Sequence, residues 1–392
     1  MAVDGLGMLL ALVRQHPGVT RSELLEQLGW SRVTLERRLN ELTESGFVVA
    51  ISQRGSTGGR PPEGFQLNAD HGVLLAADIG SSRARFAVTD FLGTPLLSVS
   101  RAFDIELGPT KALDIVRHQF RSLLTQAGFE PAAVLGIGIG IPGPVDFAAG
   151  RIIHPPTMPG WHGVEPAAAF ETDYPGAPVA VDNNANVLAL GEYRTTWRDR
   201  SDLLLIKLGQ GLSSGLVLDG RIYRGPGGMA GEFGHLYCPE GTQCRCGRFG
   251  CLESVAGGWA IQQQLQSVGN NVQSSDDVVG LAMRGNYLAL ELLTRAGEFI
   301  GEALAPAVCL MNPSTLVLAG DLARAGEVIA VPMRAAIKAR TPEYLFERLT
   351  IVPARSGSDA GVIGAAFLAQ DAACARHELT GRTDRRADRD PS

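Results

Sequence analysis

The segment Cys244-Arg245-Cys246-Gly247-Arg248-Phe249-Gly250-Cys251 places three thiols within eight residues. Its two glycines allow the backbone to fold tightly around an ion. Zinc prefers four tetrahedral ligands drawn from cysteine and histidine, so the segment predicts a zinc site that lacks one ligand. Either His235 or Cys238 can supply that ligand, and spacing alone does not distinguish them. Four protein ligands leave no position for a catalytic water, so we expect a structural zinc; the alternative is three reduced cysteines without a metal.

The sequence on both sides of this segment alternates between strands and helices. An apolar strand at 73–79 is followed by a turn and a returning strand, and residues 203–219 repeat this pattern around Gly209-Gln210-Gly211. Two similar hairpins predict an α/β domain over residues 71–375 with two related lobes, divided near residues 182–200. Further strands are predicted at 134–141, 179–181 and 315–319, and helices at 112–126, 185–196, 288–311 and 360–370.

Residues 1–70 have a different pattern, in which short helices precede a hairpin. Apolar residues recur at helical spacing in three segments, and Thr20-Arg21-Ser22-Glu23 is a capping box at the start of the second. Ser31 can cap the third helix. Strands near 47–51 and 65–67 enclose a loop rich in glycine and proline. Three helices and a hairpin predict a winged helix-turn-helix domain.

The arginines of this first domain are placed where a winged helix contacts DNA. Arginine pairs with guanine edges or phosphates, and an arginine beside proline can enter a narrow minor groove. Acidic and basic side chains nearly balance over residues 1–70, so the prediction depends on position and not on total charge. The alternative is a solvated surface on a winged helix that binds protein. The predicted DNA-binding residues are Arg32, Thr34, Arg37 and Arg38 on the third helix, and Arg54 and Arg60 in the wing.

Composition excludes several classes of protein. The 392 residues are 45% hydrophobic, enough for a large core, and the net charge of −6 excludes a uniformly basic nucleic-acid coat. No segment is apolar over the ~18 residues of a membrane helix, and no secretory signal is apparent, so we expect a cytoplasmic protein with no membrane partner. In that reducing compartment the crowded cysteines favour a metal over disulfides. The polar residues 376–392 are predicted to be disordered.

These motifs together resemble the ROK family (repressors, open reading frames and kinases), and in particular its transcriptional regulators. The resemblance extends from about Leu6 to about Gln370. It rests on Cys244-x-Cys246-Gly247-x-x-Gly250-Cys251-x-Glu253, on Gly231-Glu232-Phe233-Gly234-His235, on Gly138-x-Gly140-x-Pro142-Gly143-Pro144-Val145-Asp146, and on Gly59-Arg60-Pro61-Pro62 in the wing.

This resemblance implies a two-lobed sugar-kinase fold, actin-like and ribonuclease-H-like, with a cleft between the lobes and a zinc loop. It implies that His235 completes the zinc site with Cys244, Cys246 and Cys251, and that Cys238 lies outside it. Zinc bound to one ring nitrogen of His235 would leave the other nitrogen for a sugar hydroxyl. Carboxylates also accept hydrogen bonds from sugar hydroxyls. The implied sugar ligands are Asn183, Glu232, His235 and Glu253, with His162 near the position of a further ligand.

The sequence departs from the kinases of that family at four places. Phosphoryl transfer needs a base to accept the hydroxyl proton, and the family's kinases use an aspartate where this sequence has Asn184. An amide is not basic, and we expect Asp182 not to replace the lost base. The phosphate and adenosine elements also differ, at Asp78-Ile79-Gly80-Ser81-Ser82, Gly209-Gln210-Gly211 and Ala319-Gly320-Asp321. We therefore expect that ATP use has been lost and that the chain is not an enzyme.

The resulting hypothesis is a sugar-responsive transcriptional regulator, specifically a repressor. It would bind palindromic operator DNA as a homodimer or homotetramer. One alternative is an ATP-dependent sugar kinase that carries a DNA-binding domain, and sugar phosphorylation by the unmodified protein would favour it. Another is a regulator that responds to a partner protein, which would bind no sugar despite an intact zinc loop.

Overall fold

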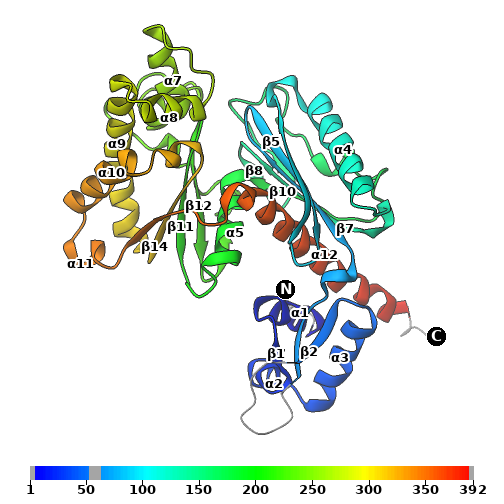
Figure 1. Ribbon diagram of the computed structural model, residues 1–392. Coiled ribbons are helices and arrows are strands. Elements are labelled where there is room, and N and C mark those ends of the chain that lie inside the picture. The colour runs from blue at the N-terminus through cyan, green and yellow to red at the C-terminus, as the bar shows by residue number, and fades with distance from the viewer. Residues whose placement is uncertain (1–4, 53–62, 388–392) are drawn as a thin grey trace.

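The computed structural model describes residues 5–52 and 63–387, and their side chains as far as residue 376. The chain forms a small N-terminal domain and two larger α/β lobes (Figure 1). Each of these three parts is built around its own sheet. No helix in the described ranges is long and apolar enough to cross a membrane.

The N-terminal domain is the predicted winged helix-turn-helix. Its elements are α1 (Gly5–Gln15), β1 (Val19–Thr20), α2 (Arg21–Leu28), α3 (Arg32–Glu44), β2 (Val48–Ser52) and β3 (Glu63–Leu67). The capping box at Thr20 and Glu23 is present in both directions, which satisfies backbone N–H groups at the start of α2 and contributes about 1 kcal/mol. The sequence did not predict β1, which pairs with β3 and completes a three-stranded sheet.

The first lobe contains a five-stranded sheet in the order β10-β7-β4-β5-β6. Its strands are β4 (Val73–Ile79), β5 (Arg83–Asp90), β6 (Pro95–Ala102), β7 (Val134–Ile141) and β10 (Val179–Asn183), and the short pair β8 (Val145–Asp146) and β9 (Arg151–Ile152) lies beside them. The first three strands are antiparallel, whereas β7 and β10 run parallel to β4. Helix α4 (Pro109–Gln126) packs on β5, and α12 (Ala360–Ala387) packs on β4 and β7.

The second lobe repeats this topology with β13-β12-β11-β14-β15. Its strands are β11 (Leu203–Leu208), β12 (Leu212–Leu218), β13 (Arg221–Tyr223), β14 (Thr315–Ala319) and β15 (Thr350–Pro353). Strands β11, β12 and β13 are antiparallel, whereas β14 and β15 run parallel to β11. The shared topology confirms two lobes of related design. Its helices are α6 (Glu253–Ala256), α7 (Gly258–Ser267), α8 (Ser275–Met283), α9 (Tyr287–Met311), α10 (Glu327–Arg340) and α11 (Glu343–Phe346).

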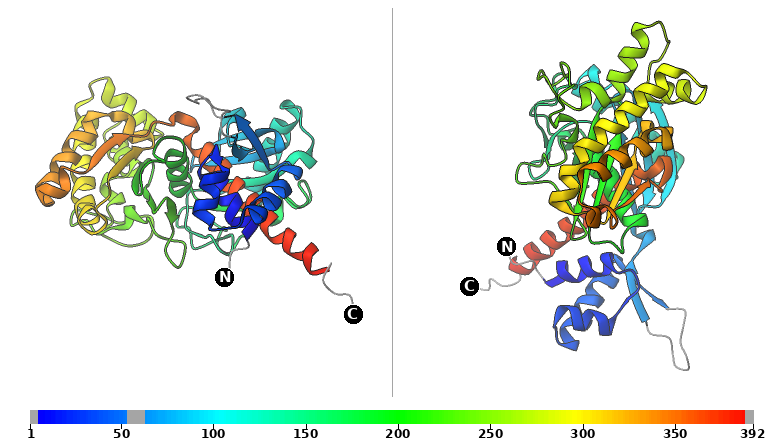
Figure 2. Two further views of the ribbon diagram at one scale, coloured as in Figure 1. Left: turned by 90° about the horizontal axis from the view of Figure 1, so that it is seen from below. Right: turned by 90° about the vertical axis from the view of Figure 1, so that its left-hand side faces the viewer.

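Helices α5 (Asn184–Thr196) and α12 connect the three parts of the molecule. Helix α5 lies between the lobes, and α12 packs along it and then reaches the N-terminal domain (Figures 1 and 2). An added Cβ at Gly364 would overlap the carbonyl oxygen of Val187, so glycine permits this close packing. Helix α12 continues to Ala387, whereas the sequence predicted disorder from residue 376. Among the side chains that the structure describes, Cys374 is the last buried residue of this helix.

Candidate functional site

A cleft of about 780 Å³ lies between the two lobes. Among the residues that line it are Asn183, Glu232, His235 and Glu253, which are four of the five predicted sugar ligands. The fifth, His162, is not a lining residue: its ring stacks on His154 with centroids 3.6 Å apart, and its Nδ1 accepts the backbone N–H of that residue at 3.2 Å. The fold thus gathers polar groups from distant parts of the chain around one cavity.

The cluster of His235, Cys244, Cys246 and Cys251 has the geometry of a metal site. All four ligand atoms lie within 4.8 Å of one another. The Sγ atoms of Cys246 and Cys251 are 3.7 Å apart, and Sγ of Cys244 is 3.8 Å from Nδ1 of His235. A tetrahedron with metal–sulfur bonds of about 2.3 Å has edges of about 3.8 Å, so the cluster fits zinc. Cys238 lies outside it, and its thiol donates to Oε2 of Glu240 at 3.5 Å.

His235 therefore presents its two ring nitrogens to different surroundings. Nδ1 faces the cysteines, while Nε2 lies 3.7 Å from Oε2 of Glu232. Burial raises the pKa of Glu232 above its usual range, His235 opposes this shift, and Glu253 adds to it. A carboxylate and a free ring nitrogen side by side can accept and donate hydrogen bonds to neighbouring hydroxyls.

The carboxylate of Glu253 is held in place by two donors. Oε2 accepts the backbone N–H of Leu212 at 2.9 Å, and Oε1 accepts the indole N–H of Trp259 at 3.1 Å. A Cβ at Gly211 would lie only 2.6 Å from Oε2, so the absence of a side chain there allows the loop to approach. Trp259 also lies under Arg245, whose Cζ is 4.8 Å from the indole ring centroid. Neither Trp259 nor Arg245 was predicted, because neither occupies a fixed position of a motif.

Asn183 and Asn184 begin α5 at the edge of the cleft. Oδ1 of Asn183 caps the helix by accepting the N–H of Ala185 at 2.8 Å, and its Nδ2 donates to the carbonyl of Gly143 at 3.0 Å. Asn184 is buried, and its Nδ2 donates to the carbonyl of Ile79 at 3.0 Å. Both amides therefore position α5 against the first lobe.

The buried carboxylate of Asp182 is fully occupied by protein groups. Oδ2 lies 2.8 Å from both Nε and Nη2 of Arg224, which itself lies over the Phe147 ring. Oδ1 accepts the N–H of Asn183 at 2.7 Å and the amide of Asn186 at 2.9 Å. These contacts engage both oxygens of the carboxylate, and it stays a prediction that Asp182 does not replace a catalytic base.

The other half of the cleft contains charged side chains from both lobes. Asp78 lies at the end of β4, Lys207 on β11, and Asp321 directly after Gly320. Burial raises the pKa of Asp78, and Lys207 opposes the shift; burial lowers the pKa of Lys207, and the two aspartates oppose that shift. Lys207 and the two aspartates therefore interact electrostatically in this half of the cleft. Lys207 was not predicted, because it belongs to no motif.

The predicted DNA-binding residues on α3 have different surroundings. Arg32 and Arg37 are exposed. The hydroxyl of Thr34 lies 2.9 Å from that of the N-cap Ser31. Arg38 is half-buried with its guanidinium 4.9 Å from the ring centroid of Trp30, so it does not face outward as predicted. Arg54 and Arg60 lie outside the described residues.

One carboxylate joins the N-terminal domain to the helix that begins in the cleft. Oδ1 of Asp371 on α12 lies 2.7 Å from Nη1 of Arg14 on α1. Oδ2 of the same residue lies 2.6 Å from Nη2 of Arg194, in the last turn of α5. The first turn of α5 therefore lies at the cleft, and its last turn contacts Asp371, the residue that pairs with the N-terminal domain.

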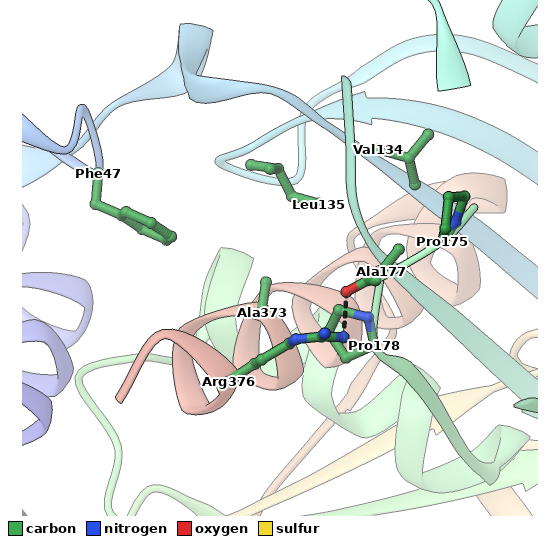
Figure 3. Close-up of a pocket in the computed structure, with 9 residues that line it drawn as sticks. Phe47, Val134, Leu135, Pro175, Ala177, Pro178, Ala373 and Arg376 are labelled. Carbon is green, nitrogen blue, oxygen red and sulfur yellow. Dashed lines mark hydrogen bonds between the residues drawn. The ribbon is translucent and has the colours of Figure 1, made fainter. Parts of the chain in front are cut away.

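A second hollow, of about 280 Å³, lies at this junction (Figure 3). Phe47 of the N-terminal domain lies on one side of it, and Leu135 and Ala373 lie across from it. The guanidinium of Arg376 donates to the carbonyl of Gly176. Arg376 is the only lining residue with a polar side chain, so the hollow lacks the carboxylates and amides that line the large cleft.

These features define a class of protein: a winged helix-turn-helix joined to a two-lobed, sugar-kinase-like domain. The profile described as "Winged helix-turn-helix DNA-binding" matches residues 7–49, and that of the "ROK family" matches residues 74–372. The chain belongs to the ROK family.

Both regulators and kinases are similar to this chain. The "Xylose repressor" of Bacillus subtilis (strain 168) is 26% identical over 366 residues, which cover 93% of this chain and 94% of the repressor. The crystal structure of a ROK family transcriptional regulator, a homolog of the E. coli MLC protein, has a TM-score of 0.80 at 25% identity and 96% and 97% coverage. A ROK family glucokinase from Streptomyces griseus, in complex with glucose and AMPPNP, has a TM-score of 0.65 at 26% identity, covering 76% of this chain and all of the kinase.

Proposed function

We propose that the protein is a sugar-responsive repressor of transcription without kinase activity. The observation that carries this proposal is the connection from Asn183 and Asn184, through α5 and Arg194, to Asp371 and Arg14. It gives a bound ligand in the cleft a physical route to the DNA-binding domain. The similarity to repressors over more than nine-tenths of the chain supports the same conclusion.

The proposed effector is a sugar or sugar derivative bound by Asn183, Glu232, His235 and Glu253. Structural zinc, held by His235, Cys244, Cys246 and Cys251, would fix the ring of His235 and leave Nε2 for a hydroxyl. Glu253 is already oriented by Leu212 and Trp259, so its carboxylate needs little reorganisation to accept a further hydrogen bond. His162 is outside this set because it does not line the cleft.

The proposed regulation is a change in lobe closure that alters the placement of two DNA-binding domains in a homodimer or homotetramer. Palindromic operator DNA suits such a symmetric assembly. The sugar must bind the DNA-competent and DNA-incompetent states with different affinities, and a coupling of about 1–3 kcal/mol is typical. Equal operator affinity with and without every sugar that binds would contradict this mechanism.

The test is capture of sheared DNA from the source genome by the purified zinc-loaded protein, with and without pooled sugars. Enrichment of a palindromic site that is lost with one sugar pool is the expected result. An enriched site that no sugar affects would favour regulation by a partner protein. Failure to enrich any site would contradict the DNA-binding function.

The second candidate function is a sugar kinase that carries a DNA-binding domain. The similarity to glucokinase over 76% of the chain favours it. Asn184 in place of a base and the engaged Asp182 oppose it. ATP-dependent phosphorylation of any sugar by the unmodified protein would establish this alternative.

A further inference from the structure

The outward side of α3 contains an apolar side chain among polar ones. Val33, Arg37 and Asn40 follow the helical spacing i, i+4 and i+7, so they share one face. All three are exposed, and Val33 has 80% of its surface accessible. The opposite face is buried in the domain core and consists of Leu35, Leu39 and Leu42.

Val33 lies in the part of α3 that reaches the bases in helix-turn-helix proteins. Ser31 is the N-cap, so Val33 is the second residue of the helix. In this class of domain the N-terminal residues of the second helix of the motif contact base edges in the major groove. An exposed valine at that position gains most if an apolar group covers it.

The acidic side chain one turn after Val33 is held away from this face. Nε of Arg21 lies 2.9 Å from Oε1 of Glu36, and the same guanidinium pairs with Glu63 of β3. Arg21 also lies over the Phe65 ring, 4.6 Å from its centroid. The single positive charge of Arg21 thereby offsets part of the negative charge of these two carboxylates, which would otherwise repel DNA phosphates near Val33 more strongly.

We propose that Val33 is a specificity-determining residue that contacts the C5-methyl group of a thymine in each half-site of the operator. This inference rests on the proposed DNA-binding function. Among the four bases of DNA, thymine alone presents a methyl group in the major groove, and small apolar side chains recognise it. Arg37 and Asn40, on the same face, supply the polar contacts that hold the register.

The test begins with a duplex selected from a random-sequence library by the full-length, zinc-loaded protein. Each thymine of one half-site is then replaced by deoxyuridine, which removes only the methyl group. We expect one position at which this replacement weakens binding about fourfold, the effect of one buried methyl group. With Val33→Ala, which removes two methyl groups, deoxyuridine at that position should have a clearly smaller effect.

The matched control is Met8→Ala, which shortens another exposed apolar side chain of the same domain, on α1. This variant should retain the full sensitivity to deoxyuridine. The inference would be overturned if the protein binds the operator but Val33→Ala does not change the loss of affinity caused by deoxyuridine at any position. That result would leave the proposed function intact. Failure to select any duplex would instead overturn the DNA-binding function itself. Circular dichroism of both variants confirms that the helices are retained.

Discussion

The side-chain amide of Asn184 donates a hydrogen bond to the backbone carbonyl of Ile79, at 3.0 Å. This bond joins the first turn of α5 to Ile79, the last residue of β4. A carboxylate at position 184 has no proton to donate above its pKa. Asn184, which we propose replaces a catalytic base, therefore also stabilises the contact between α5 and the first lobe.

We expect Asn184→Asp to destabilise the protein without restoring kinase activity. Two acceptors would face each other in a buried site, which costs about 1–3 kcal/mol in free energy of unfolding. Urea denaturation measures the loss, and an ATP-dependent phosphorylation assay with pooled sugars measures activity. Phosphorylation by the variant alone would show that the base was the only missing element of a kinase site.

Substitution of Cys246, a proposed zinc ligand, should have a different effect from substitution of Cys238, which lies outside the cluster. We expect Cys246→Ser to lose bound zinc and to weaken sugar binding about tenfold or more, because the ring of His235 is no longer fixed. Cys238→Ser is the matched control, since Cys238 is a buried thiol of the same loop outside the cluster. Metal content by mass spectrometry and calorimetric sugar titration provide the readouts. Equal zinc loss in both variants would contradict the assignment of His235.

The role of Glu253 can be tested by a change that preserves its shape. Glu253→Gln turns an amide N–H₂ toward the N–H of Leu212 or Trp259 and removes the charge that a sugar hydroxyl would meet. A hydrogen bond to a charged group contributes about 1.5–3 kcal/mol, so we expect sugar affinity to fall by roughly 10- to 100-fold. Glu327→Gln, on the exposed surface of α10, should leave it unchanged. Calorimetric sugar titration of both variants measures these affinities. Equal sugar affinity in the Glu253→Gln variant and the unmodified protein would contradict the role of Glu253.

Loss of the Asp371 carboxylate should uncouple the cleft from the DNA-binding domain. Asp371→Asn weakens both ion pairs, to Arg14 and Arg194, while it retains the size of the side chain. We expect the sugar to change operator affinity by less than about threefold in this variant, against the 5- to 150-fold range of typical allosteric coupling. Asp173→Asn, which removes the 2.8 Å pair with Arg117 in the first lobe, is the control. Full coupling in the Asp371 variant would contradict the route through α12.

The sequence predicted the architecture well where local signals were strong. The capping box at Thr20 and the cap at Ser31 determine where α2 and α3 begin, and both are confirmed. The hairpins of the two lobes were recognisable because buried apolar strands flank glycine-containing turns. The strand β1 was missed because two residues are too few for a pattern.

The site was predicted only as far as its motifs extend. The cysteine spacing left His235 and Cys238 open as the fourth ligand, and the structure groups His235 with the three thiols, which favours the histidine. Trp259, Lys207 and Asp371 escaped prediction because their roles depend on partners that tertiary packing brings close. Arg38 was misplaced because helical spacing predicts a face but not the stacking of a long side chain on Trp30.

The ion pair between Arg14 and Asp371 also has a consequence for biosynthesis. These residues are 357 positions apart, so the N-terminal domain leaves the ribosome long before its anchor on α12 is synthesised. Until translation has passed Asp371, a nascent chain has a complete α3 but lacks the ion pair that joins its domain to α12. A truncated product that ends before α12 would keep the recognition surface and lose the connection to the cleft.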